Sequence, residues 1–431
     1  MRIIFLFLLI STYSCLSVFS QSDFNRFFEK KSLRIDFALS GNFDFQIASL
    51  QQLRQEPTWS GPIKNLIDPF EYGGYYIQVF DKESDQLIYS RGLNTLFEEW
   101  RATEQAKTET QSWTNSIAIP YPKKEVTLNI QARSKKDLQF ESLLKVDVDP
   151  SSIFIDKSKL HSNSMVPILI NGDVSDKIDL VFLGEGYSAE EQEKFIADVN
   201  RFTEAFFKSA PFNLHQKDFN IRAVKLISEE SGTDISGKGI FKNTALNSGF
   251  YTFGVERYLT TPDMKSIRDA VWDVPCDAIF ILVNTDIYGG GGMYNFYAIG
   301  SADNAKTIEV FVHEFGHSFA GLADEYFSSE VGYDEDYYDT NVEPWEPNIT
   351  SLVNFKSKWE NMLSPGTPIP TPLNETYKNN LGVFEGAGYL SKGMYRPVDH
   401  CMMRDLTPFC PVCKRAIVRM IDFLCDRNLV Q

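Results

Sequence analysis

His313, Glu314 and His317 form the pattern H-E-x-x-H, which combines two potential metal ligands with a potential catalytic acid. Apolar residues recur around them at three- and four-residue intervals, which predicts a helix; they are Ile308, Phe311, Phe315 and Phe319. Because histidines four positions apart share a helix face, the two rings can bind one zinc ion on the side away from the apolar stripe. Glu314 beside them is placed to take a proton from metal-activated water and pass it to a leaving amine.

A catalytic zinc site needs a third protein ligand and an open position for water. Gly321 can end the helix in a left-handed conformation and turn the chain back toward the metal. Asp324 or Glu325 would then be the third ligand. Asp324 is favoured, because its offset from Gly321 matches that of the third ligand in the metzincin pattern H-E-x-x-H-x-x-G-x-x-H. In the other interpretation, one or both acids only support the histidines through hydrogen bonds.

The segment from His313 to Tyr326 closely resembles the signature of the immunoglobulin A peptidase family, metallopeptidase family sixty-four. Further stretches are similar to segments of that family: Asp179–Tyr187, Glu343–Thr350, Phe384–Ala387, Tyr395–Pro397 and Asp399–Arg404. The resemblance implies a zinc endopeptidase with a metzincin-like catalytic domain, preceded by an N-terminal β-domain. It does not imply that immunoglobulin A is the substrate.

A methionine turn lies beneath the zinc in metzincins. Alignment of residues 399–404 with the Ser-x-Met-Arg turn of the family makes Met403 this residue, with Met402 as the alternative and an ordinary core methionine as the plainer interpretation. Tyr395 and Arg396 are candidates for stabilising the oxyanion of the tetrahedral intermediate. His400 is expected on the substrate side or in support of the ligands.

Four consecutive glycines, 289–292, precede a run from Met293 to Ile299 that has the composition of a strand. Glycines suit the rim of a cleft, where one backbone approaches another closely. We therefore expect Gly290, Gly291 and Tyr294 to contact substrate, with an extended peptide pairing along this strand. A flexible hairpin tip is the alternative.

Residues 1–20 have the features of a signal peptide, with one early cation and the apolar run Ile3–Ile10. Cleavage before Gln21 would give an exported protein, and Cys15 leaves lipid attachment as an alternative. No later stretch has the length and apolar character of a membrane-spanning helix. The net charge of −16 argues against nucleic acid or an anionic membrane as partner. The resemblance to a peptidase family implies a protein or peptide substrate. The sequence does not indicate an oligomeric state.

The chain length suits two domains and the pattern of elements predicts an α+β fold. Residues 21–160 contain short alternating strands, including a hairpin across Asp81–Asp85, and predict a β-sandwich. Residues 161–431 are expected to form the catalytic domain. There a buried strand at 178–183, an amphipathic helix at 195–206 and further strands at 219–227 and 277–283 precede the histidine helix. This is the order of elements expected for a metzincin-like domain, which the resemblance implies, with a twisted mixed sheet and an active-site helix.

Five cysteines lie beyond the signal peptide: Cys276, Cys401, Cys410, Cys413 and Cys425. Export favours disulfides, and bridges among the last four would join the methionine turn to the closing helix. Cys410 and Cys413 also have the spacing of a zinc ribbon or a redox pair, but no second C-x-x-C accompanies them.

The sequence thus predicts a secreted zinc endopeptidase. One rival is a peptidase of the gluzincin kind, with Glu360 or Glu385 as third ligand. The other is a non-catalytic surface adhesion or glycan-binding protein in which zinc is structural.

Overall fold

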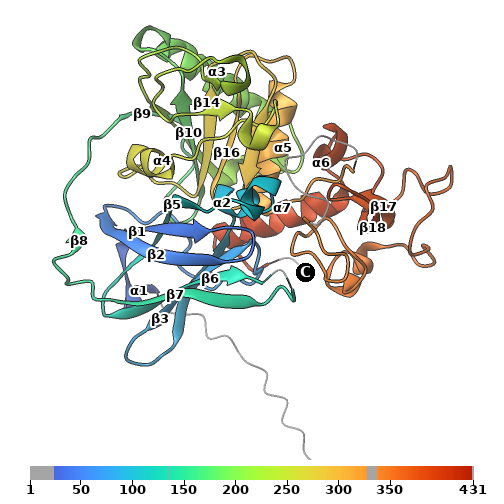
Figure 1. Cartoon of the computed structure of the whole chain (residues 1–431), viewed down its shortest axis with the longest axis horizontal. Coiled ribbons are helices and arrows are strands. Elements are labelled where there is room, and N and C mark those ends of the chain that lie inside the picture. Colours follow the sequence, from blue (N-terminus) through green and yellow to red (C-terminus); the bar gives the residue numbers. More distant parts are fainter. Residues whose placement is uncertain (1–23, 135, 328–336, 430–431) are drawn as a thin grey trace, which may run out of the picture.

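The computed structural model describes residues 24–134, 136–327 and 337–429. The predicted signal peptide and Cys15 therefore lie outside the described residues. The fold is a mixed α+β fold, with sheets in both parts of the chain and most of the helices in the second part (Figure 1).

The N-terminal part contains two four-stranded sheets, with strand orders β5-β1-β2-β8 and β4-β3-β6-β7. Their strands are β1 Phe28–Gly41, β2 Gln46–Glu56, β3 Tyr75–Asp81, β4 Leu87–Leu93, β5 Gln111–Pro122, β6 Val126–Arg133, β7 Phe140–Val148 and β8 Ile155–Asp156. The expected hairpin is present as β3 and β4, which pair antiparallel. Two short helices, α1 Phe24–Phe27 and α2 Leu96–Trp100, flank these sheets.

The second part is built on a six-stranded sheet of order β15-β16-β14-β10-β11-β9. The four inner strands run parallel, whereas β15 and β9 pair antiparallel at the two edges. In chain order the strands are β9 Ser164–Leu169, β10 Ile178–Glu185, β11 Phe219–Lys225, β14 Ala278–Val283, β15 Gly290–Met293 and β16 Tyr297–Ser301. Every residue of β10 is buried, as the apolar run at this position predicts for a central parallel strand.

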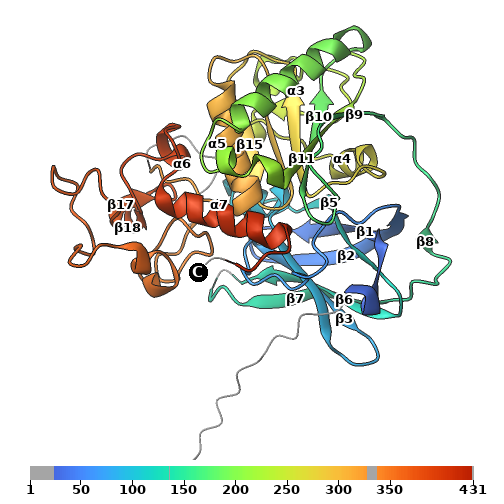
Figure 2. The same cartoon turned by 180° about the vertical axis from the view of Figure 1, so that it is seen from behind.

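Helices cover this sheet and complete the second part: α3 Gln192–Phe206, α4 Met264–Ala270, α5 Thr307–Ala320, α6 Met402–Asp405 and α7 Pro411–Leu424. Ser188 and Glu191 form a capping box just before α3. Two small sheets pair β12 Asp234–Ile235 with β13 Gly249–Phe250, and β17 Phe384–Ala387 with β18 Leu390–Arg396. Figure 2 shows α7 crossing the middle of the molecule below α3.

The apolar stripe of α5 packs against the sheet and against α3 through aromatic side chains. The ring of Phe311 lies 4.6 Å from that of Phe280 on β14, in a T-shaped pair. The ring of Phe315 lies 5.2 Å from that of Phe206 on α3. Burying a side chain of this size stabilises the fold by roughly 1.5–3 kcal/mol. This packing fixes which face of α5 remains free, and that face carries the two histidines.

The prediction of one strand from Met293 to Ile299 was wrong. The chain turns here, so that the glycines themselves form the edge strand β15, and β16 begins only at Tyr297. A run of glycines can serve as a strand at this place because β15 lies directly against α5. A Cβ atom at Gly292 would lie only 2.3 Å from the backbone oxygen of Glu314.

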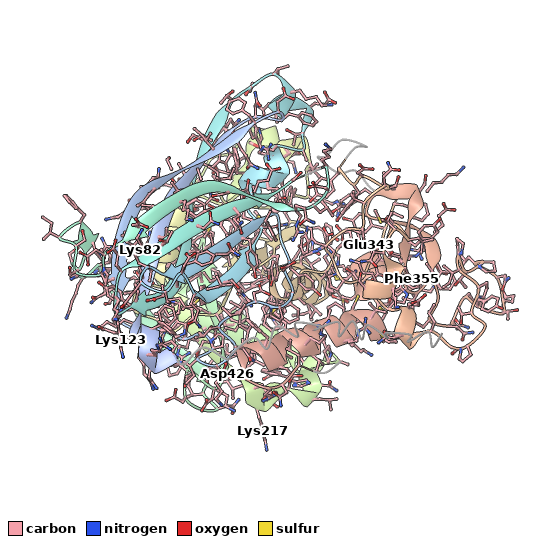
Figure 3. All side chains as sticks on the ribbon, turned by 90° about the horizontal axis from the view of Figure 1, so that it is seen from below. Lys82, Lys123, Lys217, Glu343, Phe355 and Asp426 are labelled. Carbon is pink, nitrogen blue, oxygen red and sulfur yellow. The ribbon has the colours of Figure 1, made fainter. Side chains whose placement is uncertain are left out.

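The two parts of the chain contribute side chains to a common hydrophobic core. One hydrophobic core contains residues of both N-terminal sheets and also residues of the six-stranded sheet, such as Leu33, Ile77, Val181 and Ile281. Asp426, labelled in Figure 3, follows α7 and accepts hydrogen bonds from the backbone N–H groups of residues 63–65. The connection through β8 to β9 runs along the outside of the molecule (Figure 1).

The C-terminal part is rich in loops and lies to one side of the six-stranded sheet, where Figure 3 labels Glu343 and Phe355. Within the described residues, no helix is long and apolar enough to cross a bilayer.

Candidate metal centre

The helix α5 ends where the sequence predicts, at Gly321, whose φ of 63° is left-handed. The next turn is closed by backbone hydrogen bonds from Gly321 to the carbonyl of His317 and from Leu322 to the carbonyl of Gly316. This reversal brings residues 322–325 back beneath the histidine face of the helix. Asp324 thereby lies next to both imidazoles.

Three donor atoms meet at one point on this face. The Nε2 atoms of His313 and His317 lie 3.1 Å apart. The Oδ1 atom of Asp324 lies 3.2 Å from Nε2 of His313 and 3.3 Å from Nε2 of His317. Zinc–ligand bonds of about 2.0–2.1 Å at tetrahedral angles separate donor atoms by about 3.3 Å. The three atoms are therefore spaced as one face of a zinc tetrahedron.

Backbone carbonyls orient both imidazoles. Nδ1 of His313 lies 2.9 Å from the carbonyl oxygen of Met402, and Nδ1 of His317 lies 2.5 Å from that of Leu322. Because a carbonyl oxygen only accepts, each Nδ1 must carry the proton and donate it. Each Nε2 of a neutral ring then offers a lone pair to the common point, the arrangement usual for metal-bound histidine.

A hydrogen bond also orients the carboxylate of Asp324. Its Oδ2 atom accepts a 2.6 Å hydrogen bond from the hydroxyl of Tyr389. Its Oδ1 atom is buried, and its nearest polar neighbours are the two Nε2 atoms, although no hydrogen bond of good geometry reaches it from the described residues. Burying this carboxylate costs free energy, and a positive charge at the common point, either a metal ion or a protonated imidazole, would offset that cost. The donor set and its spacing thus fit a zinc ion.

The ionisable groups around this point shift one another's pKa values. Burial opposes ionisation of Asp324, but the two imidazoles outweigh it and hold its pKa well below the usual range. Burial likewise opposes a charge on His317, yet the Asp324 carboxylate and Glu314 raise its pKa to about 9. Burial raises the pKa of Glu314 above its ordinary value.

The remaining acids considered from the sequence lie elsewhere. Glu325 points away from the imidazoles, and its Oε1 accepts a hydrogen bond from Nδ2 of Asn348. Glu360 and Glu385, the third ligands of the gluzincin alternative, are exposed and do not belong to the group around His313 and His317. The described geometry therefore favours Asp324.

A cavity opens beside the three donors. Glu314 lies on its wall next to the edge strand, and a Cβ atom at Gly290 would lie 2.9 Å from Oε1 of Glu314. The other lining residues include all four glycines, several tyrosines and Arg257. The cavity thus offers a place where an extended chain could lie against the donors.

The predicted substrate-contacting residues line this cavity, but part of the edge strand is already paired. The N–H group of Leu259 donates a 3.3 Å hydrogen bond to the carbonyl of Gly290, and Gly291 pairs with Ile299 inside the sheet. A peptide therefore cannot pair along the whole of β15 in this conformation. Tyr294 is almost fully buried and packs on Trp345, with ring centroids 5.9 Å apart.

Met403 lies under the histidine helix. Its Sδ atom is 3.1 Å from the place of a Cβ atom at Gly316, so the glycine between the histidines lets the sulfur approach. The carbonyl of Met403 also accepts a 2.7 Å hydrogen bond from the backbone of Glu325. Met403 is buried and is placed as a floor to the site.

The structure does not bring Tyr395 and Arg396 to the cavity. Neither side chain lines it. The Arg396 guanidinium is buried and donates to the carbonyls of Glu385 and Gly386, where it holds the β17–β18 hairpin. His400 is exposed and contacts Asp405.

Sequence reasoning missed several residues that shape the site. No local sequence pattern points to Tyr389, because it lies 65 positions from Asp324, which it contacts. Asn348 bonds both the N–H and the carbonyl of Ala323 and so fixes the loop before Asp324. From the N-terminal part, Asn94 and Glu99 line the cavity, and the hydroxyl of Tyr258 contacts Glu99.

Comparison with known protein families agrees with this geometry. The family model described as IgA Peptidase M64 matches residues 166–379 and 373–421, which is more than half of the chain. The chain belongs to this family. A second model, described as Peptidase M64 N-terminus, matches residues 23–144 of this M64 peptidase. The family membership expected from the sequence is confirmed, and it makes the protein a metallopeptidase. A search of curated proteins found no match.

Proposed function

We propose that this M64 peptidase is a secreted zinc-dependent endopeptidase that hydrolyses peptide bonds of a protein or peptide substrate. The observation that carries the proposal is the triangle of Nε2 of His313, Nε2 of His317 and Oδ1 of Asp324 beside an accessible cavity. Three protein donors next to open space suit a catalytic zinc ion, which keeps one position for water or substrate. When bound, zinc would polarise the scissile carbonyl and activate water.

The chain's own residues would carry the proton transfers. Glu314 is the general base, because its carboxylate lies on the cavity wall directly beside His313. It would accept a proton from the attacking water and donate it to the leaving amine nitrogen. Its raised pKa favours both roles, since a catalytic acid and base works best near neutral pH. The imidazoles and Asp324 would keep their orientation through the carbonyls and through Tyr389.

We further propose that residues 161–431 form a metzincin-like catalytic domain and that the two N-terminal sheets form a sandwich within residues 21–160. The six-stranded mixed sheet with an antiparallel edge strand beside α5, and Met403 beneath that helix, support the first assignment. The shared core between the two four-stranded sheets supports the second. Residues 1–20 would direct export, in keeping with the signal-peptide pattern.

A non-catalytic adhesion or glycan-binding protein is the less supported alternative. A structural zinc ion is normally enclosed by four protein ligands. Around His313 and His317 the described residues supply three donors, and the adjoining space is a cavity rather than a fourth side chain.

Digestion of a peptide library by the purified protein, with and without a chelator, tests the proposal. We expect internal cleavage of peptides that chelator abolishes and added zinc restores. Glu314→Gln should keep the metal, because its carboxylate is not among the three donors, and should lose about 10²–10⁴-fold in rate. Glu360→Gln makes the same chemical change at an exposed site and should leave the rate unchanged. Equal cleavage by wild type and Glu314→Gln would refute the assigned role.

A further inference from the structure

A second group of side chains of the kinds that bind metal ions lies close to the first. It consists of Glu325, Cys401, Cys410 and Cys413, and their ligand atoms lie within 4.8 Å of one another. All four residues are buried. None of these atoms belongs to the group formed by His313, His317 and Asp324. The three cysteines come from the methionine turn and the start of α7, whereas the glutamate follows directly after Asp324.

The distances suit a metal ion better than a disulfide. The Sγ atoms of Cys401 and Cys413 are 3.7 Å apart. A disulfide bond is about 2.05 Å long. Two thiolates bound to one zinc ion at about 2.3 Å and tetrahedral angles lie about 3.8 Å apart. Oε1 of Glu325 lies 3.2 Å from Sγ of Cys413, which makes the carboxylate part of the same shell.

The surrounding backbone suits negatively charged sulfur. Cys410 is the N-cap residue of the 14-residue helix α7, and the N–H group of Cys413 donates to its sulfur at 3.4 Å. The N–H group of Cys410 donates to the sulfur of Cys401, also at 3.4 Å. Both the N–H groups and the positive end of a helix stabilise a thiolate, the form that binds metal.

Glu325 supplies an independent sign that a cation belongs here. Its side chain is fully buried, yet its Oε2 atom has no hydrogen-bond partner among the described residues. The other oxygen accepts from Nδ2 of Asn348 at 2.9 Å. A carboxylate buried among thiols with one oxygen unsatisfied costs folding free energy, and a bound cation would offset that cost.

We propose that Glu325, Cys401, Cys410 and Cys413 form a second, structural zinc site. Three sulfur ligands favour a soft ion such as zinc over magnesium or calcium. Four protein ligands close the shell, so this site would not leave a position for water. On binding, the three thiols release their protons, and no oxidation or reduction takes place.

Such an ion would tie together three segments that shape the catalytic centre. Glu325 follows the ligand Asp324, and Cys401 precedes Met402, whose carbonyl orients His313. Cys410 and Cys413 begin the helix that packs against α5. Cys425 is outside the group, since its sulfur lies near the carbonyl of Asp218 instead.

Metal analysis of the full chain tests this proposal without using peptidase activity. After loading with zinc and gel filtration, we expect about two zinc ions per chain in the wild type. His313→Ala/His317→Ala should retain about one, and Cys410→Ser should lose one. Cys425→Ser, a matched change of another buried cysteine, should retain both. Retention of zinc by the double histidine variant separates this proposal from the proposed peptidase function.

A second measurement is needed in case Cys410→Ser does not fold. Cobalt loaded into the double histidine variant should give the near-ultraviolet charge-transfer absorption of a thiolate-bound ion. Thiols should also be counted in wild-type protein denatured with chelator, before and after reductant. A gain of two thiols on reduction in both the wild type and Cys425→Ser would reveal a disulfide that includes a cysteine of the site and would overturn the proposal. A metal-free double histidine variant, or cobalt without thiolate absorption, would overturn it as well.

Discussion

The hydroxyl of Tyr389 donates a 2.6 Å hydrogen bond to Oδ2 of Asp324, whose other oxygen completes the triangle of donors. Partners of this kind orient a ligand, and their loss typically weakens metal binding about 10- to 100-fold. We therefore expect Tyr389→Phe to raise the Kd for zinc by that factor. Competition with a chromophoric chelator measures it. Tyr395→Phe is the matched control, because Tyr395 does not line the cavity. Unchanged affinity in Tyr389→Phe would show that the hydroxyl does not support the metal.

The choice of third ligand can be tested by comparing three alanine variants. Asp324→Ala removes one of the three donors and should abolish zinc binding at the histidines together with hydrolysis. Glu360→Ala and Glu385→Ala change exposed residues and should retain both. Zinc content and peptide cleavage measure the two properties. Loss of metal in either glutamate variant, with metal retained in Asp324→Ala, would favour the gluzincin arrangement.

The pKa of His317 predicts how zinc affinity at the histidines depends on pH. Burial opposes its charge, but Asp324 raises the pKa to about 9, so the metal-free ring carries a proton at pH 7 that zinc must displace. The Kd should therefore fall about tenfold per pH unit for each proton released, from pH 7 until about pH 9. Calorimetry in buffers of different ionisation enthalpy counts those protons. A Kd that is constant across this range would contradict the assignment.

The raised pKa of His317 also determines how the stability of the metal-free protein changes with pH. Because the folded pKa of His317 is raised, its pairing with Asp324 stabilises the fold fully below the unfolded value of about 6.5. That contribution is lost as the pH rises through about 9. Asp324→Asn should remove this pH dependence from denaturant titrations of the metal-free protein.

Gly292 has no room for a side chain, since a Cβ atom would lie 2.3 Å from the backbone oxygen of Glu314. We expect Gly292→Ala to push β15 away from α5 and to lower both stability and peptidase activity. Gly366→Ala is a useful comparison, because that glycine has open space around it but a φ of 84°. It should cost about 1–2 kcal/mol of unfolding free energy from backbone strain alone and leave activity intact. Equal activity in the two variants would show that the close approach of Gly292 to the backbone of Glu314 is not required for peptidase activity.

The shared core predicts cooperative unfolding of the two parts of the chain. Residues of both N-terminal sheets and of the six-stranded sheet pack in one cluster, and buried Arg34 on β1 forms an ion pair of 2.6 Å with Asp269 on α4. Calorimetry should therefore show a single transition, and Arg34→Met should lower its midpoint. Two separate transitions would indicate that the parts fold independently.

Local sequence patterns determined much of this protein. The spacing of Phe311, Phe315 and Phe319 predicts both the helix and its buried face, and thereby the side on which the histidines lie. Gly321 and the offset of Asp324 predict the reversal that the structure contains. These inferences succeed because helix periodicity and a left-handed turn depend on residues only a few positions apart.

The packing of the folded chain determines which distant residues join this site. Tyr389 lies 65 positions from Asp324, and the carbonyl that orients His313 belongs to a residue 89 positions away. The glycines became an edge strand because α5 lies against them, a contact that strand propensity does not encode. Glu325 meets Cys413 across 88 positions for the same reason. Such contacts arise from how whole elements pack, so composition and spacing along the chain do not reveal them.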